Sequence, residues 1–484
     1  MIYAKREPSF EARHQAFGYQ TTAVDKIAGL EYGAIFHEQG LGKTKIALDI
    51  ALRWLSGSIV DSILVCTKKH LVDNWRDEII LHTFVHPRVL SQDRSANFRA
   101  FNSPARIYLT HYEVLASEQS RLTLFLKTRR VAVFLDEAQK IKNPETRVSQ
   151  AAFALANGFA RRVILTGTPI ANRPYDIWSL IYFLDDGATL GSDYKKFKRV
   201  FDLDNRFTPD RKVEFEAALG DLWPSIAAFS VRETKQSSNL NLPEKNVHDI
   251  LVDLEHRQQE IYDAYKDELR TVIIRGGQPV MDNADEILKR LLRLVQIASN
   301  PFIVDDSYRK QPGKFSTLEQ IVESAIDSKE KIIVWTSFVK NAEWLGRELS
   351  NYGTVIIHGA VGDDDRRSRL RAFKSDPDTR ILVATPGAAK EGLTLTVANH
   401  AVFFDRVFSL DDYLQAQDRI HRISQVRECH VYNILARDTI DEWVASLIQA
   451  KVLAAQFGQG DITNAAFLGD MSYEFGEILT KILS

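Results

Sequence analysis

The chain has 484 residues, which predicts about three domains, or two if the domains are large α/β lobes. Its 62 Lys and Arg residues nearly balance 64 Asp and Glu residues, and 45% hydrophobic residues are typical of a globular protein. Disordered, collagen-like and disulfide-rich classes are excluded, and no apolar run approaches the ~18 residues of a membrane span. The chain lacks the strongly basic footprint of many nucleic-acid-binding domains, so composition alone predicts a large cytosolic enzyme.

Short β-branched runs alternate with helical patterns, which is typical of parallel sheets with crossover helices. Nearly all residues in these runs are apolar, as expected for strands buried on both faces. The predicted strands are 62–66, 106–109, 131–135, 162–165, 331–336, 354–358, 380–384, 401–404 and 429–434. The fold class is therefore α/β, with two parallel-sheet lobes. Tryptophans with apolar flanks are expected in the cores rather than against bases: Trp75, Trp178, Trp335 and Trp344.

Strand signals are sparse between the two lobes, in residues 185–330. Apolar residues at 287–295 recur at three- and four-residue spacing, which indicates one helical face. We therefore expect a first lobe at 1–184, a helical insertion and linker at 185–330, and a second lobe with a C-terminal helix at 331–484.

A glycine-rich loop, His-Glu-Gln-Gly-Leu-Gly-Lys-Thr at 37–44, follows an apolar run and precedes a helical pattern. Glycines let backbone N–H groups approach phosphate oxygens, and a helix N-terminus adds partial positive charge. In such a loop Lys43 reaches the β- and γ-phosphates and Thr44 binds Mg²⁺. The P-loop pattern has glycine at the position of His37, so a glycine-rich turn with a solvated lysine is the alternative.

Two carboxylates, Asp136 and Glu137, follow the predicted strand at 131–135. Ligands of open α/β sheets bind at the carboxyl ends of the strands. Phosphoryl transfer requires a carboxylate that holds Mg²⁺ and a group that orients the attacking water. Asp136 suits the first role and Glu137 the second. An ordinary acidic loop is the alternative, which the preceding P-loop makes weaker.

A helix is predicted after Ser409, which can form a capping box with Asp412. Gln415, Arg419 and Arg422 then fall at i, i+4 and i+7 on one helical face. An arginine that reaches a γ-phosphate can raise the rate of phosphoryl transfer by about 10³–10⁵-fold. We expect Arg422 to be this finger and Arg419 to support it; a solvated, salt-bridged helix is the alternative.

These motifs, together with Leu-Thr-Gly-Thr-Pro-Ile at 165–170, resemble helicase superfamily two and, more narrowly, the Swi/Snf (Snf-two) ATPases. The most specific stretch is Gln-Ala-Gln-Asp-Arg-Ile-His-Arg-Ile-Ser-Gln at 415–425, and the resemblance extends from Phe17 to about Lys451. The family also has a non-glycine residue at the first position of its loop.

The chain departs from the family pattern at two places. Gln139 stands where many members have histidine, at a position that usually links to the other lobe. Ala389 and Lys390 replace a glycine pair in the motif that touches nucleic acid. Different coupling between the lobes is therefore expected, with the chemistry of ATP hydrolysis retained.

The resemblance implies two RecA-like lobes that close on ATP and Mg²⁺, and it assigns roles to individual residues. Gln20 matches the family glutamine that recognises adenine. The expected nucleotide-binding residues are Gln20, His37, Gly40, Leu41, Gly42, Lys43 and Thr44, and Mg²⁺ is assigned to Thr44 and Asp136. The expected catalytic residues are Glu137, Asp136, Lys43, Arg419, Arg422 and Gln415. Contact with DNA, or its coupling to ATP, is assigned to Thr67, Thr110, Gly167, Thr168, Thr385 and Gly392.

The resemblance implies an ATP-dependent translocase that moves along or remodels double-stranded DNA or protein–DNA complexes. Three alternatives share the same motifs: a strand-separating or annealing helicase on forked DNA, an RNA-directed helicase, and a motor subunit of a multi-chain defence or restriction assembly. We expect a monomeric motor without a membrane partner, targeted by a partner protein or by DNA structure. The expected location is the cytoplasm and nucleoid of a bacterial or virus-infected cell, or the nucleus of a eukaryote.

Overall fold

The structure is a computed structural model, and it divides the chain into two compact units. It describes residues 8–102, 105–170, 173–201, 209–238, 240, 242–275, 278–279, 284–388 and 394–462. Among these, unit 1 comprises the residues up to 201 together with 209–240 and 454–462, and unit 2 comprises those of 242–453. Gly392, Ala389 and Lys390 lie outside the described residues.

Unit 1 contains a seven-stranded parallel sheet with the order β3-β4-β2-β5-β6-β1-β7. Its strands are β1 Tyr32–Ile35, β2 Ser62–Thr67, β3 Arg88–Val89, β4 Ile107–His111, β5 Val131–Asp136, β6 Arg161–Leu165 and β7 Ser230–Val231. All residues of β2, β4 and β5 are buried, which explains their continuous apolar sequences.

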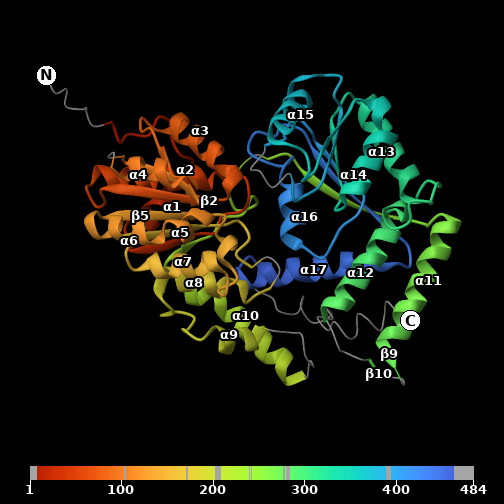
Figure 1. Cartoon of the computed structure of the whole chain (residues 1–484), viewed down its shortest axis with the longest axis horizontal. Coiled ribbons are helices and arrows are strands. Elements are labelled where there is room, and N and C mark those ends of the chain that lie inside the picture. The colour runs from red at the N-terminus through yellow and green to blue at the C-terminus, as the bar shows by residue number, and fades with distance from the viewer. Residues whose placement is uncertain are drawn as a thin grey trace. The chain divides into compact units, whose positions relative to one another are not determined.

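Helices connect these strands, as parallel pairing requires. They are α1 Gly18–Ala28, α2 Lys43–Ser56, α3 Val72–His82, α4 Arg94–Asn102, α5 Tyr112–Ser117, α6 Gln119–Thr128, α7 Arg147–Ala156, α8 Asp176–Asp185, α9 Tyr194–Phe201 and α10 Pro209–Ile226, with short 3₁₀ turns η1 Lys69–Leu71 and η2 Ala138–Ile141. Helix α2 packs between α1 and α3, whereas α7 packs against α5, α6 and α8 (Figure 1). In the core, the Trp54 ring packs 5.6 Å from Phe134, and its Nε1 donates to the Ala28 carbonyl at 2.8 Å.

Unit 2 contains a six-stranded parallel sheet with the order β12-β13-β11-β14-β15-β8. Its strands are β8 Lys245–Val252, β11 Ile332–Trp335, β12 Thr354–Ile357, β13 Ile381–Ala384, β14 His400–Phe403 and β15 Cys429–Ala436; a short hairpin pairs β9 Ile274–Arg275 with β10 Gln278–Pro279. The predicted strands of both halves are thus confirmed to within two residues at each end.

The helices of unit 2 include most of a long C-terminal one that confirms the expected helix; its residues from 454 on belong to unit 1. They are α11 His256–Ile273, α12 Ala284–Ser299, α13 Lys314–Asp327, α14 Val339–Glu348, α15 Asp363–Ser375, α16 Leu410–Gln417 and α17 Ile440–Gly458, with η3 Pro301–Ile303 and η4 Ser350–Tyr352. Unit 2 also buries an ion pair, in which Lys314 Nζ lies 2.5 Å from Asp441 Oδ2. Lys314 Nζ also donates to the Phe404 carbonyl at 3.0 Å.

The segment 185–330 is not purely helical, which corrects the sequence prediction. It adds β7 to the sheet of unit 1 and β8 to the sheet of unit 2. Strand β7 has only two residues, and β8 is an edge strand with Val247 50% and Leu251 45% exposed. Neither strand therefore has the continuous apolar sequence of a central parallel strand. Among the helices in the described part of the chain, none is long and apolar enough to cross a membrane.

Candidate active site

The predicted site motifs of unit 1 meet at one edge of its sheet. Strands β2, β5, β6 and β1 are consecutive neighbours and run parallel, so the loops after them emerge together at their carboxyl ends. These loops carry the glycine-rich loop, Thr67, the pair Asp136 and Glu137, and the Thr-Gly-Thr turn at 166–168. The structure therefore brings the predicted phosphate loop and both carboxylates to the same edge.

The glycine-rich loop has the backbone of a phosphate cradle and folds around its own lysine. Gly40 and Gly42 have φ values of 86° and 72°, which favour glycine. Lys43 begins α2, and its Nζ donates to the carbonyls of His37 at 3.0 Å and Glu38 at 3.2 Å. A buried ammonium and a helix N-terminus thus share one loop, an arrangement that binds anions. Thr44, in the first turn of α2, is partly buried.

Gln20 contacts the glycine-rich loop directly. Its Nε2 donates to the Leu41 carbonyl at 3.2 Å, and its Oε1 accepts from the Phe17 backbone N–H at 3.0 Å. A Cβ atom at Gly42 would lie 2.4 Å from Gln20 Nε2, so only glycine allows this approach. The Tyr19 hydroxyl also donates to the Leu41 carbonyl, at 3.0 Å. The predicted adenine-recognising residue is therefore fixed against the predicted phosphate loop.

His37 occupies the first loop position as a neutral side chain. It is 2% exposed, and neither ring nitrogen has a hydrogen-bond partner among the described residues. Burial, together with the positive charge of Lys43, lowers the pKa of His37 to about 3. The loop therefore contains one cationic side chain at neutral pH, Lys43, beside an uncharged imidazole.

Asp136 ends β5 and is held by two donors from other elements. Its Oδ2 accepts from Thr67 Oγ1 at 2.9 Å and from Trp75 Nε1 at 2.8 Å. Burial and the adjacent charge of Glu137 raise the pKa of Asp136 to about 6, although these two hydrogen bonds oppose the shift. The expected burial of Trp75 is confirmed, and its indole also orients this carboxylate, which sequence reasoning missed.

The donors at this edge fit Mg²⁺ in a nucleotide complex. Among the described residues, no three His, Cys, Asp or Glu side chains cluster in a way that could hold a metal. Mg²⁺ is usually bound through one or two carboxylates and substrate phosphates rather than by an all-protein cage. The carboxylate of Asp136 and the hydroxyl of Thr44 are oxygen ligands of this kind. The raised pKa of Asp136 reflects burial first and then the negative charge of Glu137, which a divalent cation would offset.

Glu137 is held ionised in a strained backbone conformation. Its φ of 52° and ψ of 49° are left-handed, which is uncommon outside glycine and clusters at functional sites. Gln139 Nε2 donates to Glu137 Oε2, and Lys68 Nζ lies 3.3 Å from the same oxygen. Burial opposes ionisation, but the charges of Lys68 and Lys43 hold the pKa of Glu137 below its usual value. Gln139, the departure from the family pattern, thus positions the expected water-orienting carboxylate.

The residues predicted for DNA contact or coupling occupy different environments. Thr67 and Thr110 are fully buried; the Thr110 hydroxyl donates to the Leu90 carbonyl at 3.3 Å. In the Thr-Gly-Thr turn, a Cβ atom at Gly167 would lie 2.9 Å from Gln39 Nε2, so this turn packs on the phosphate loop. The backbone N–H of Thr168 donates to Thr166 Oγ1 at 3.2 Å. These contacts favour coupling through the loops rather than direct contact between Thr67 or Thr110 and DNA.

The arginine segment of unit 2 is not one continuous helix, which corrects the prediction. Ser409 caps α16 by accepting from the Asp412 N–H at 3.3 Å, as expected, but α16 ends at Gln417. Gln425 links the turns that follow α16 to the segment before β14. Its Nε2 donates to the Ile420 carbonyl in these turns and to the carbonyls of Thr396 and Ala398 in that segment.

The predicted catalytic side chains of unit 2 consequently occupy two different elements. Gln415 lies on α16, where its Nε2 donates to Asp411 Oδ1 at 2.9 Å. Arg419, 4% exposed, and Arg422 lie in the turns that follow. Arg422 Nε donates to the Asp418 carbonyl at 2.9 Å, and its guanidinium donates to Thr394 Oγ1 at 3.1 Å. Thr385 is 7% exposed at the end of β13.

Sequence reasoning missed Arg232, which links three parts of unit 1. Its guanidinium donates to the carbonyl of Phe36, before the phosphate loop, at 2.6 Å and to that of Gly167 at 3.4 Å. It also donates to both carboxylate oxygens of Asp461, at 2.9 and 2.6 Å. Asp461 follows α17, so a residue near the end of the chain supports, through Arg232, two turns of the candidate site.

A second missed contact joins the same segment to the phosphate loop. The backbone N–H of Lys235 donates to Glu38 Oε2 at 2.8 Å, and Lys235 Nζ lies 3.6 Å from Glu38 Oε1. The Glu38 N–H donates to the Glu233 carbonyl at 2.8 Å. The sequence did contain a signal for these contacts, namely the cluster of charged residues directly after β7. Charged groups beside a buried strand need partners, so this cluster predicts contacts of the kind observed.

A P-loop with a buried lysine, beside two carboxylates at the edge of a parallel sheet, defines a P-loop nucleotide-hydrolase lobe. The comparison with family models defines a narrower class than this. Residues 19–303 match the SNF2-related domain, and residues 313–424 match the helicase conserved C-terminal domain. Because the first match alone covers more than half of the chain, the chain belongs to the SNF2-related family of ATP-dependent helicase-like enzymes, as its motifs predicted.

Relatives with similar sequences are longer than this chain. An uncharacterized ATP-dependent helicase of Mycoplasma pneumoniae is 28% identical over 89% of this chain and 41% of its own length. A Bacillus subtilis protein, YwqA, named only provisionally as an ATP-dependent helicase/translocase, is 28% identical over 92% of this chain and 49% of its own. The chain thus spans about half or less of these relatives. A solved SWI2/SNF2 ATPase core of Sulfolobus solfataricus in complex with dsDNA is 26% identical over 99% of each chain, with a TM-score of 0.43.

Proposed function

We propose that the chain hydrolyses ATP with Mg²⁺ and uses the energy to move along or remodel double-stranded DNA. The observation that carries the ATPase part is one edge of the sheet of unit 1. Lys43 lies in the loop after β1, Asp136 ends β5 and Glu137 follows it, with only β6 between these two parallel strands. Duplex DNA as the track comes from the resemblance of the motifs alone, whereas the helicase/translocase name of the Bacillus subtilis relative supports ATP-driven movement without naming a track.

Each side chain of unit 1 has a role that follows from its contacts. Lys43, which now donates to two loop carbonyls, is placed to exchange these acceptors for phosphate oxygens. Thr44 and Asp136 would hold Mg²⁺, which neutralises phosphate charge when bound. Glu137, kept ionised by Lys68 and Lys43, accepts a hydrogen bond from the attacking water and orients it.

The roles in unit 2 rest on the resemblance. Arg422 is proposed to stabilise the charge that develops on the γ-phosphate, with Arg419 and Gln415 as supporting groups. Both arginines follow α16 in turns that Gln425 holds. A preorganised guanidinium needs no reorganisation during the reaction, which favours this assignment. The proposed place of action is the compartment that contains the DNA.

The test is the ATPase rate of the full chain with duplex DNA, single-stranded DNA, forked DNA and duplex RNA. We expect duplex DNA to stimulate the rate most and to support triplex displacement without strand separation. Unwinding of forked DNA would favour a helicase, and stimulation by RNA alone would favour an RNA-directed enzyme. An ATPase rate that no nucleic acid changes would refute the proposed motor activity. The chain would then be a nucleic-acid-independent ATPase or a subunit of a larger assembly.

Two variants test the assigned chemistry. Lys43→Ala should abolish hydrolysis, because the loop then lacks its only cationic side chain. Glu137→Gln should retain ATP binding but lower turnover by about 10²–10⁴-fold, the usual contribution of a positioned base. Lys310→Ala changes an exposed lysine of unit 2 and is the matched control. Turnover of Glu137→Gln near the wild-type rate would refute the assignment of Glu137.

A further inference from the structure

Helices α4 and α6 of unit 1 form a basic surface without acidic residues. The 9 residues of α4 and the 10 residues of α6 contain Arg94, Arg99, Arg121 and Lys127 and no Asp or Glu. In the whole chain, by contrast, 64 acidic residues slightly outnumber 62 basic ones. The positive charge is therefore concentrated locally, and this surface differs from the average of the chain.

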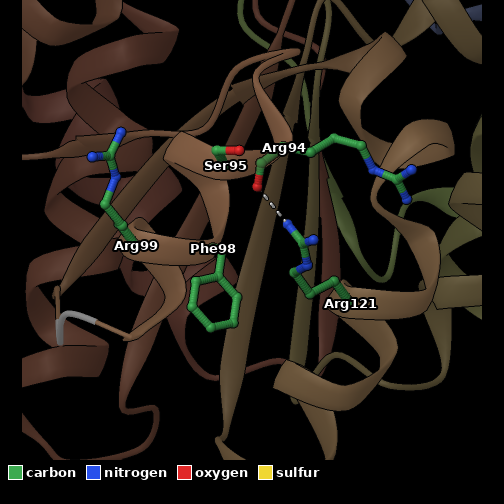
Figure 2. Close-up of a pocket in the computed structure, with 5 residues that line it drawn as sticks. All are labelled: Arg94, Ser95, Phe98, Arg99 and Arg121. Carbon is green, nitrogen blue, oxygen red and sulfur yellow. Dashed lines mark hydrogen bonds between the residues drawn. The ribbon is translucent and has the colours of Figure 1, made fainter.

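An open pocket of about 610 Å³ lies on this surface, lined by Arg94, Ser95, Phe98, Arg99 and Arg121. Phe98 is 58% exposed, which is unusual for a large aromatic side chain. In Figure 2 its ring lies between the side chains of Arg99 and Arg121, whereas the Arg94 guanidinium extends away from it. The pocket thus presents an apolar ring flanked by two cations.

Contacts within unit 1 hold the walls of the pocket before any ligand binds. Arg121 donates to the Arg94 carbonyl at 2.9 Å and lies 3.0 Å from the carboxylate of Glu118, which is 2% exposed (Figure 2). Below the surface, the rings of Phe101 and Phe125 pack α4 against α6 with centroids 5.2 Å apart. A preformed pocket reduces the entropy that binding would otherwise cost.

Two acidic groups precede these helices in the sequence, and both are already engaged in contacts within unit 1. Glu118 is buried and pairs with Arg121. Asp93 caps α4, because its Oδ1 accepts from the backbone N–H groups of Ser95 at 2.8 Å and Ala96 at 3.1 Å. Arg99, by contrast, has no hydrogen bond or ion pair among the residues that the structure describes. It is therefore available to an anionic ligand.

We propose that this pocket binds an acidic segment of a partner protein that also carries a large apolar side chain. Carboxylates of the partner would pair with Arg99 and Arg121, and its apolar side chain would cover Phe98. Arginine and aromatic residues together are enriched at protein interfaces, and guanidinium groups bind carboxylates in a bidentate way. Leu124, one turn after Arg121 on α6, is 64% exposed and extends the apolar part of this surface.

A protein segment fits these observations better than duplex DNA. Phosphates would satisfy the arginines, but the backbone of duplex DNA offers no large apolar group to cover Phe98 and Leu124. The proposal is independent of ATP hydrolysis, because it rests on α4, α6 and their pocket alone.

The test is selection of a random peptide display library against the full chain, followed by affinity measurement of the enriched peptides as synthetic probes. We expect sequences rich in Asp and Glu around a Phe, Leu or Trp. Arg99→Glu and Phe98→Ser should each weaken binding of such a peptide by about tenfold or more, as central interface residues do. Both side chains are exposed, so both variants should keep the thermal stability and the peptide-free ATPase rate of the wild type. The matched control is Arg371→Glu, a charge reversal at an exposed arginine of α15.

Two results would overturn the proposal. One is the absence of acidic, apolar-containing peptides from the enriched pool, or their equal affinity for the wild type and both variants. The other is a loss of duplex DNA affinity in both variants without a loss of peptide affinity, which would assign the surface to nucleic acid.

Discussion

The contact between Arg232 and Asp461 predicts that one side-chain carboxylate, that of Asp461 after α17, stabilises two turns of the candidate ATP site. Asp461→Asn keeps the shape of the side chain but removes the charge that accepts two hydrogen bonds, at 2.9 and 2.6 Å. A hydrogen bond to a charged group contributes roughly 1.5–3 kcal/mol, and the loss of one partner of a buried pair costs about 3–5 kcal/mol. The two side chains are 11% and 13% exposed, and the amide oxygen still accepts one bond, so we expect a loss of about 2 kcal/mol.

Amide hydrogen exchange measures this loss locally. The N–H groups of Phe36 and Thr166 are hydrogen-bonded within the sheet of unit 1, next to the carbonyls that Arg232 binds. A loss of about 2 kcal/mol should speed their exchange by about 30-fold. The control is Arg53→Gln, which removes an exposed ion pair whose side chains are 49% and 60% exposed and should change little. Exchange of both amides in Asp461→Asn at the rate of the control would refute the reasoning.

Four further predictions concern Gly42, Lys314 and Asp136. Gly42→Ala should weaken nucleotide binding by about tenfold in a titration, because the residue has φ 72° and the new Cβ would lie 2.4 Å from Gln20 Nε2. Lys314→Ala should lower the free energy of unfolding of unit 2 by about 3–5 kcal/mol in urea, because Asp441 remains buried and unpaired. Since the folded-state pKa of Asp136 is raised to about 6, folding should lose stability as the pH rises from about 4 to 6. Below pH 6, protons should compete with Mg²⁺ and weaken its binding about tenfold per pH unit in titrations with nucleotide.

Central strands and loop motifs were predictable because their physical constraints are local. All six residues of Val131–Asp136 are buried, so the strand must be apolar on both faces until its final carboxylate. The phosphate loop likewise depends on glycines and a lysine within a few positions. Edge strand β8 was missed because solvent on one side of it permits polar and charged residues.

The contacts that support the site were hidden because they depend on tertiary structure. Arg232 and Asp461 are 229 positions apart, and no sequence spacing encodes such a pair. Trp75 was correctly expected in the core, but its hydrogen bond to Asp136 requires the fold to bring the indole of α3 to the end of β5. The end of α16 was mispredicted because the side chain of Gln425, beyond the expected helix, binds the turns that follow α16.

The division of unit 1 into distant parts of the chain has a consequence for its synthesis. Residues 454–462 belong to unit 1, although residues 242–453, the described part of unit 2, are translated before them. At about 5–20 residues per second, the ribosome reaches Asp461 roughly 10–50 s after Arg232, which is 229 positions earlier. During that interval the nascent unit 1 has a guanidinium without its carboxylate partner. The carbonyls of Phe36 and Gly167, which Arg232 binds, should therefore gain their full support only after residues 242–453 of unit 2 have been translated.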